Sequence, residues 1–286
     1  MSYGLDGPVH RWFTSYLKGR TQYVRCGSAR SAAKPVLYGL PQGSVLGPIL
    51  LLLYTADLIQ LVESHDLSAH LYADDTQVYG LCQSRESPQL LHRLSDCLVD
   101  VAVWMRSNRL QLNTAKTEVI WFASSRRQHQ IQQTPLIVGS NTVVPVCVVR
   151  DLGIHLDSDL LMGTHVIKTA SSCFAVLRQI RSIRRSVPRP TLQTLVASLV
   201  LSKLDYGCAT LAVLPATLLD RLQSVLNAAV RLIYGRRKYD HVTPLLRELH
   251  WLRVPERIVF RVGDTCVSLS TQHGAALSRR PATSGQ

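Results

Sequence analysis

Two adjacent carboxylates, Asp74 and Asp75, follow an apolar segment that ends in Tyr72-Ala73. Like charges side by side in a packed hairpin are costly unless a cation neutralises them. In two-metal sites for phosphoryl transfer, carboxylates hold Mg²⁺ ions about 3.5–4 Å apart, and the ions stabilise the attacking and leaving oxygens. The tetrapeptide therefore predicts a metal site, and the residues leave open the alternative of a solvated Asp-Asp turn.

The residues around this pair predict elements that present it. Residues 69–73 and 76–79 are β-compatible runs, so a hairpin with Asp74-Asp75 at its turn is expected. Upstream lies a Gly/Pro loop, and Ser44 is placed to cap a helix that runs to about Ser64. Downstream, Pro88 opens a helix that ends near Asn108, with apolar residues at three- and four-residue spacing.

The remaining pattern changes from mixed to helical along the chain. Two further strands are expected at 21–26 and 118–122, and several short ones between 136 and 156. The expected helices are 8–17, 164–186, 191–204, 215–234 and 254–267. A mixed first part and an all-helical second part indicate a boundary near residue 160.

Composition favours a folded chain with a polyanionic partner. The 286 residues are 46% hydrophobic and carry a net charge of +13, with 13 basic and 10 acidic residues in 1–143 against 19 and 9 in 144–286. Seven scattered cysteines without a C-x-x-C pair indicate reduced, mostly buried thiols and no zinc knuckle. No signal peptide or membrane span is visible, so we expect an intracellular, nuclear or cytoplasmic protein without membrane contact.

Three motifs in order resemble those of reverse transcriptases. Residues 39–50 (GLPQGSVLGPIL), 72–75 (YADD) and 113–118 (NTAKTE) are similar to the family's motifs B, C and D. Residues 151–157 and 239–252 resemble later segments of non-LTR (LINE-type) retrotransposon enzymes of the jockey and chicken-repeat type. The resemblance spans about residues 3–267, and several independent motifs in order make it specific.

This resemblance implies an α+β fold, namely a partial right-hand polymerase fold with a palm sheet and flanking helices, followed by an all-helical thumb. It implies partial fingers and palm over 1–160 and a basic thumb with a C-terminal segment over 161–286. The implied activity is RNA-directed DNA polymerase, with transfer of deoxynucleotides to a primer 3′-hydroxyl. The implied partners are an RNA template, a DNA primer or RNA–DNA duplex, and deoxynucleoside triphosphates.

The resemblance also assigns roles to residues. Asp74 and Asp75 match the metal-binding pair, for Mg²⁺ with Mn²⁺ as a substitute, and Asp74 is the favoured direct ligand. Lys116 matches a lysine near the departing pyrophosphate. The expected contacts to nucleotide and template are Pro41, Gln42, Gly43, Ser44 and Tyr72. The expected nucleic-acid contacts of the thumb are Arg178, Arg181, Arg185, Arg236, Arg237 and Lys238.

The sequence departs from the family pattern at motif A. That motif supplies a third carboxylate from an upstream strand, and the only acidic residue before Asp57 is Asp6, in a turn-like setting. We therefore expect an N-terminally truncated domain. Three hypotheses stay open: an active polymerase fragment, a catalytically inactive nucleic-acid-binding relic, and a basic structural module whose Asp74-Asp75 is only a turn.

Overall fold

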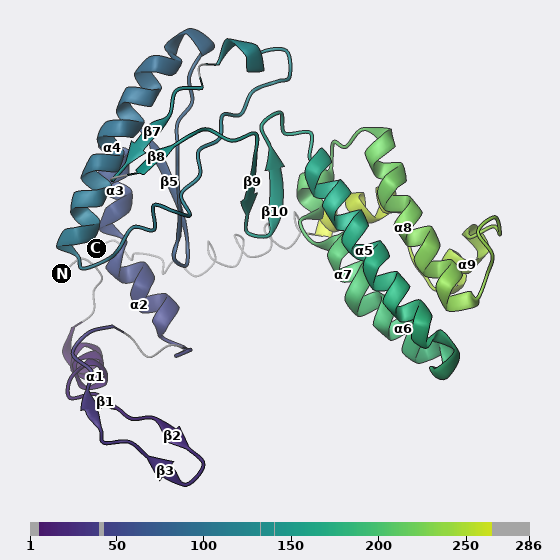
Figure 1. Cartoon of the computed structure of the whole chain (residues 1–286), viewed down its shortest axis with the longest axis horizontal. Coiled ribbons are helices and arrows are strands. Elements are labelled where there is room, and N and C mark those ends of the chain that lie inside the picture. Colours follow the sequence, from purple (N-terminus) through teal and green to yellow (C-terminus); the bar gives the residue numbers. More distant parts are fainter. Residues whose placement is uncertain (1–5, 40–42, 132, 140, 265–286) are drawn as a thin grey trace, which may run out of the picture. The chain divides into compact units, whose positions relative to one another are not determined.

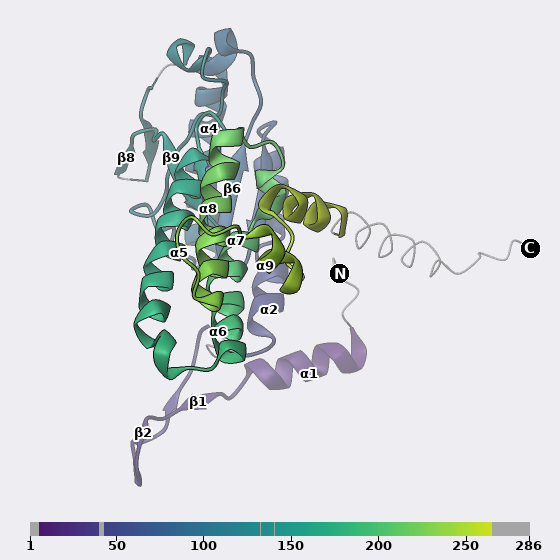
Figure 2. The same cartoon turned by 90° about the vertical axis from the view of Figure 1, so that its right-hand side faces the viewer.

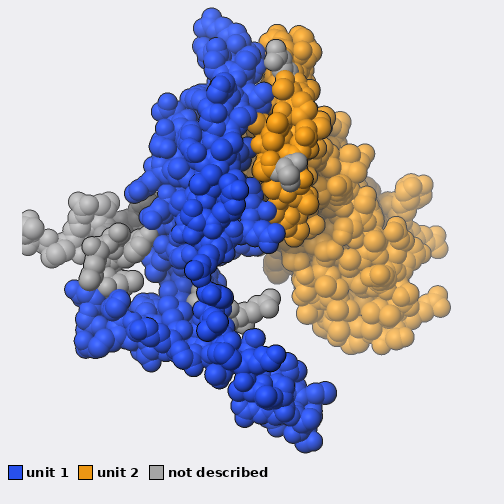
Figure 3. All heavy atoms as spheres, turned by 60° about the vertical axis from the view of Figure 1, so that its left-hand side comes forward, with its two compact units in different colours: residues 1–112 blue, residues 113–286 orange. Residues whose placement is uncertain are grey.

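The computed structural model describes residues 6–39, 43–131, 133–139 and 141–264. The chain forms two compact units, Met1–Leu112 and Asn113–Gln286, coloured blue and orange in Figure 3. Each unit has its own buried residues and is described by itself.

The first unit begins with a helix and a projecting β-ribbon (Figure 1). Helix α1 (Gly7–Leu17) has a proline in its first turn, as expected, and buries none of its residues. The ribbon contains β1 (Thr21–Gln22) paired with β4 (Lys34–Pro35), and β2 (Arg25–Cys26) paired with β3 (Ala29–Arg30). The single strand expected over 21–26 is therefore wrong, because the pairing is interrupted between β1 and β2.

Helices and one hairpin make up the rest of the first unit. The single helix expected up to Ser64 is wrong, because the backbone leaves the helical region at Thr55 (φ −100°, ψ 5°) and divides it into α2 (Gly47–Tyr54) and α3 (Asp57–Glu63). The Thr55 hydroxyl donates to the Leu51 carbonyl at 2.9 Å. Strands β5 (Ser68–Tyr72) and β6 (Asp75–Tyr79) are antiparallel, and a 3₁₀ turn (Ser84–Glu86) leads into α4 (Ser87–Ser107). The buried apolar residues of this unit are Leu58, Val62, Leu67, Leu90, Cys97 and Val101.

The second unit opens with two more hairpins. Strands β7 (Leu136–Val138) and β8 (Asn141–Val143) pair, as do β9 (Val148–Asp151) and β10 (Ile154–Asp157), which confirms the short strands expected there. The strand expected over 118–122 is wrong. Instead of a ladder, the segment and the residue after it make isolated backbone bonds: the Val119 carbonyl accepts the Val146 N–H at 2.8 Å, and the Ala123 N–H donates to the Ser158 carbonyl at 3.0 Å.

From Gly163 onward the described chain is helical. Helices α5 (Gly163–Ile183) and α8 (Ala216–Tyr234) lie side by side in both views (Figures 1 and 2). The other segments are a 3₁₀ turn (Arg184–Ser186), α6 (Arg189–Val196), a π turn (Ala197–Leu201), α7 (Ser202–Asp205), a 3₁₀ turn (Cys208–Leu211), α9 (Thr243–Glu248) and a helix over 254–264. Their apolar faces form one core, from Met162 to Ile258.

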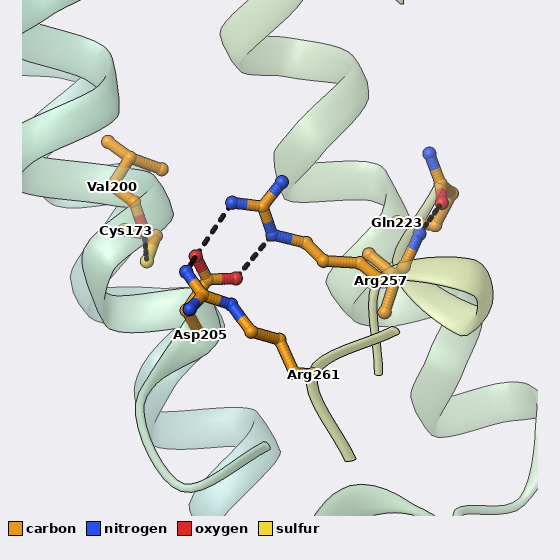
Figure 4. A network of polar contacts seen from close by, with 7 residues as sticks. Cys173, Val200, Asp205, Gln223, Arg257 and Arg261 are labelled. Carbon is orange, nitrogen blue, oxygen red and sulfur yellow. Dashed lines mark hydrogen bonds and ion pairs between the residues drawn. The ribbon is translucent and has the colours of Figure 1, made fainter. Parts of the chain in front are cut away.

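A carboxylate with two arginines fastens the last described helix to this core (Figure 4). Asp205, at the end of α7, accepts hydrogen bonds from Arg257 at both carboxylate oxygens and from Arg261 at 3.2 Å. The Asp205 side chain is only 13% exposed, and that of Arg257 only 19%. This buried ion pair fixes the 254–264 helix against α7.

The mixed helix-and-strand class is confirmed. In the described ranges the strands pair as five two-stranded sheets, so the joined palm sheet and the thumb remain predictions. No helix in those ranges is both long enough and apolar enough to cross a membrane. The expectation of mostly buried thiols is wrong: of the six described cysteines, all of them free, only Cys97 and Cys173 are buried.

Candidate active site and nucleic-acid interface

The carboxylate pair lies at the tip of the β5–β6 hairpin. Tyr72 is the register partner of Asp75, so the turn consists of Ala73 and Asp74. Asp75 therefore begins β6, which corrects the expectation that both carboxylates occupy the turn. Ala73 adopts the left-handed region with φ of 53°, and this backbone bend directs the chain from Tyr72 into Asp74. Both aspartates and Tyr72 are exposed, so the structure brings these three site residues together in an accessible position.

The base of the hairpin is anchored in the core of the first unit. Gly80 follows β6, and a Cβ there would lie 2.5 Å from Leu90 and 2.9 Å from Leu67. Leu67 and Leu90 are both buried, and Leu90 belongs to α4. A tightly packed base with an exposed tip gives the two carboxylates a rigid support.

The donor chemistry of the tip fits a hard divalent cation. Mg²⁺ prefers oxygen ligands and commonly binds one or two carboxylates together with substrate phosphates. Asp74 and Asp75 supply that number of carboxylates. No cluster of three or more His, Cys, Asp or Glu residues able to hold a metal occurs within the described ranges. The two carboxylates therefore suit a metal ion whose remaining coordination positions are filled by a phosphate ligand.

The loop before α2 is described from Gly43 onward, and Pro41 and Gln42 lie outside the described residues. Gly43 has φ of 77°, where a side chain would be strained, and a Cβ there would meet no atom within 4 Å. Open space beside a bare backbone permits close approach by a ligand. The N-cap residue of α2 is Leu46, so the expectation that Ser44 occupies this position is wrong, although the Ser44 hydroxyl accepts the Gly47 N–H at 3.1 Å.

Lys116 lies in the second unit, in a turn where its N–H donates to the Asn113 carbonyl at 3.1 Å. Asn141 of β8 donates to the Thr114 hydroxyl at 2.7 Å and so holds this turn against the β7–β8 hairpin. The Lys116 side chain is exposed. Asp74 and Asp75 belong to the first unit, so the structure describes the lysine and the carboxylates separately.

The basic residues expected to contact nucleic acid are all exposed. Arg178 and Arg181 lie on α5, and Arg185 lies in the 3₁₀ turn after it. On the adjoining side of α5, Leu177 and Ile180 are buried. Arg236, Arg237 and Lys238 directly follow α8.

The structure brings the arginines at the end of α5 close to the basic residues after α8, through contacts that the sequence spacing did not reveal. Gly235, at the end of α8, packs directly on the Arg184 guanidinium, so the chain around Arg185 and the chain around Arg236 meet at one end of the helices. Arg189 lies 3.7 Å from the centre of the Tyr234 ring and donates to Glu248 at 2.7 Å. This hydrogen bond lowers the pKa of Glu248. Only tertiary packing brings these distant residues together, so no local sequence signal predicts the arrangement.

Comparison with known proteins gives one family and several relatives. Residues 3–141 match the reverse transcriptase (RNA-dependent DNA polymerase) family. The chain is 27% identical over 263 residues to the RNA-directed DNA polymerase named for transposon X-element and 27% identical over 259 residues to that named for transposon BS. It is 23% identical over 276 residues to that of mobile element jockey. All three relatives are from Drosophila melanogaster.

These alignments cover 89%, 88% and 93% of this chain but 28% of each relative, so the chain spans less than a third of their length. No solved structure matches the chain. The matched range contains the Gly43 loop, the Asp74-Asp75 hairpin and the Lys116 turn. Residues 3–141 therefore match the reverse transcriptase family, and the chain is similar over most of its length to three transposon-encoded RNA-directed DNA polymerases.

Proposed function

We propose that the chain is the part of an RNA-directed DNA polymerase that carries carboxylates of the nucleotidyl-transfer centre and a helical surface for the template–primer duplex. The observation that carries this proposal is the exposed Asp74-Asp75 pair on an anchored hairpin, inside the range that matches the family. Its substrates are an RNA template, a DNA primer and deoxynucleoside triphosphates.

Asp74 and Asp75 hold Mg²⁺, or Mn²⁺ in its place, and Asp74 in the turn is the more direct ligand. When bound, the metal lowers the pKa of the primer hydroxyl and neutralises phosphate charge. Gly43, with Gln42 and Ser44, offers backbone N–H groups to the phosphates and template, and Pro41, which has no N–H, contacts them through its ring. Lys116 stabilises charge on the departing pyrophosphate or donates a proton to it. Tyr72 borders the nucleotide beside Asp75.

The division of labour follows the change in secondary structure near residue 160. Residues 1–160 form partial fingers and palm, and 161–286 form the thumb. Arg178, Arg181, Arg185, Arg236, Arg237 and Lys238 contact the phosphate backbone, reading charge and shape rather than sequence.

A second candidate is nucleic-acid binding without synthesis. It is favoured by the two-carboxylate donor set, because the described residues add no third ligand beside Asp74 and Asp75. A metal held by too few protein ligands activates the primer hydroxyl poorly. In that case the chain binds template and primer but does not extend the primer.

Primer extension on an RNA template, with Mg²⁺ and then Mn²⁺, separates the two candidates. We expect extension by the chain and a loss of about 100-fold or more in Asp74→Asn, because one metal ligand is removed. Asp220→Asn, an exposed aspartate on α8, is the matched control and should keep the activity. Binding without extension would support the second candidate. Extension that survives in Asp74→Asn would contradict the proposed role of the hairpin.

A further inference from the structure

The β-ribbon of the first unit is a second charged surface, separate from the carboxylate hairpin. We name residues 21–35, which form the strands β1 to β4 and the turns between them (Figures 1 and 2), the basic ribbon. Every one of these residues is exposed. An isolated two-stranded ribbon is marginally stable in water, because it buries almost no apolar surface. A ribbon with no buried residue therefore gains most from a partner that contacts it.

The register places two of its three charged side chains, Arg25 and Arg30, on one face. Arg25 is paired with Arg30 and Cys26 with Ala29, whereas Gln22 is paired with Lys34. The second strand therefore contains one extra residue between β3 and β4, which is a bulge and increases the local twist. Because side chains alternate along a strand, Tyr23 lies on the same face as Arg25 and Arg30. The Arg30 guanidinium carbon is 3.4 Å from the centre of the Tyr23 ring.

The electrostatics of this face are unfavourable in the free chain. Arg25 and Arg30 are directly opposite, and like charges at paired positions destabilise a ribbon. Residues 7–56 contain six Lys or Arg residues and no Asp or Glu. Within the described part of the chain, no ion pair joins a carboxylate to the cations of the ribbon. A polyanion on this face would remove the repulsion.

We propose that the basic ribbon binds double-stranded DNA, entering the major groove with Arg25 and Arg30 against the flanking phosphates. The major groove of B-form DNA, about 12 Å wide, admits a two-stranded ribbon, whereas that of A-form RNA is too narrow. Arg30 covers one face of Tyr23, so the ring is a poor stacking platform for single strands. The inference rests on the proposed function only in taking nucleic acid as the partner.

The test measures binding of the full chain to a labelled DNA duplex at several salt concentrations, without metal or nucleotides. Arg25→Ala/Arg30→Ala should weaken binding about tenfold and reduce the slope of log affinity against log salt by about 2, one unit per lost phosphate contact. Arg126→Ala/Arg127→Ala, the control, removes two exposed arginines outside the ribbon. It should change both the affinity and the salt slope less than the ribbon variant does. Arg25→Lys/Arg30→Lys keeps the charge and should keep most of the affinity.

The inference is overturned if the unmodified chain does not bind the duplex, or if the ribbon variant matches the Arg126/Arg127 control. It is also overturned if the loss is confined to an RNA duplex or to single-stranded DNA. Circular dichroism should show the same fold in all variants, because the substituted side chains are exposed. Primer extension is measured in a separate assay. A chain that does not extend primers can therefore still be tested for duplex binding by the ribbon, and a ribbon that does not bind DNA leaves the extension result unchanged.

Discussion

His165 is a buried titratable side chain at the start of α5, next to the β9–β10 hairpin. Its Nδ1 accepts the N–H of His155 at 3.4 Å, and the two rings lie 6.2 Å apart. Burial lowers the pKa of His165, and the His155 ring lowers it further, while Asp157 opposes both effects. Burial also lowers the pKa of His155, together with Lys168 and Arg150.

We expect the free energy of unfolding to fall as the pH drops from 7.5 to 5. A histidine whose pKa is lowered in the folded chain binds a proton more readily in the unfolded chain. Its contribution to the free energy of unfolding is therefore complete above about pH 6.5 and is lost as the pH falls below that value. His165→Asn keeps an acceptor for the His155 N–H but does not titrate. Its melting temperature should therefore fall less over this pH range. Equal falls in the variant and the unmodified chain would show that His165 does not contribute.

At the scale of elements, the attachment of the 254–264 helix depends on Asp205. Asp205→Asn would leave the Arg257 charge largely buried without its partner, so we expect the free energy of unfolding to drop by about 2–3 kcal/mol. Glu248→Gln is the control, because it breaks an exposed ion pair with Arg189 and should cost far less. Urea denaturation of both variants measures the difference. Comparable losses would contradict a structural role for the buried pair.

The elements also show how far the sequence can be used to predict this fold. Prolines open α1, α2, α4, α6 and α9 within their first turn, so these helix starts are encoded locally. Residues 118–122 have high strand propensity, but a strand requires a neighbouring ladder, which local residues do not specify. The start of β6 at Asp75 depends on a left-handed Ala73, a conformation that alanine does not favour. The carboxylate hairpin was therefore predictable, whereas the exact position of each carboxylate on it was not.

The candidate site also has some features that the sequence predicts and others that depend on tertiary packing. Exposure of Arg178 and Arg181 follows from helical spacing against buried Leu177 and Ile180, so it was predictable. The contact between Gly235 and Arg184 joins positions far apart in the chain, and only the packing of α5 against α8 creates it. Local patterns specify which side chains face outward, and tertiary packing decides which of them meet.

At the scale of the whole molecule, charge is unevenly distributed. Residues 144–286 contain 19 basic and 9 acidic residues, whereas 1–143 are nearly balanced. Within the nearly balanced part, the basic ribbon concentrates cations locally. The molecule therefore has two basic surfaces, one in each unit, and both are proposed to contact nucleic acid.

Charge reversal on α5 and in the 3₁₀ turn after it tests the basic surface of the second unit. Arg178→Glu/Arg181→Glu/Arg185→Glu should weaken binding to an RNA–DNA duplex and flatten its salt dependence, because three phosphate contacts are lost and the slope falls by roughly 3. Arg126→Glu/Arg127→Glu/Arg221→Glu makes the same change in net charge at exposed positions of the same unit and is the matched control.

A salt slope like that of the control would exclude α5 as a duplex-binding face, since a general change in net charge would then explain the whole effect. Combining the α5 substitutions with Arg25→Ala/Arg30→Ala gives a further check on a DNA duplex. The two sets lie in different compact units, so their free-energy effects on binding should add to within about 0.5 kcal/mol if each contacts its own stretch of backbone. Strong non-additivity would mean that one surface binds only when the other is engaged.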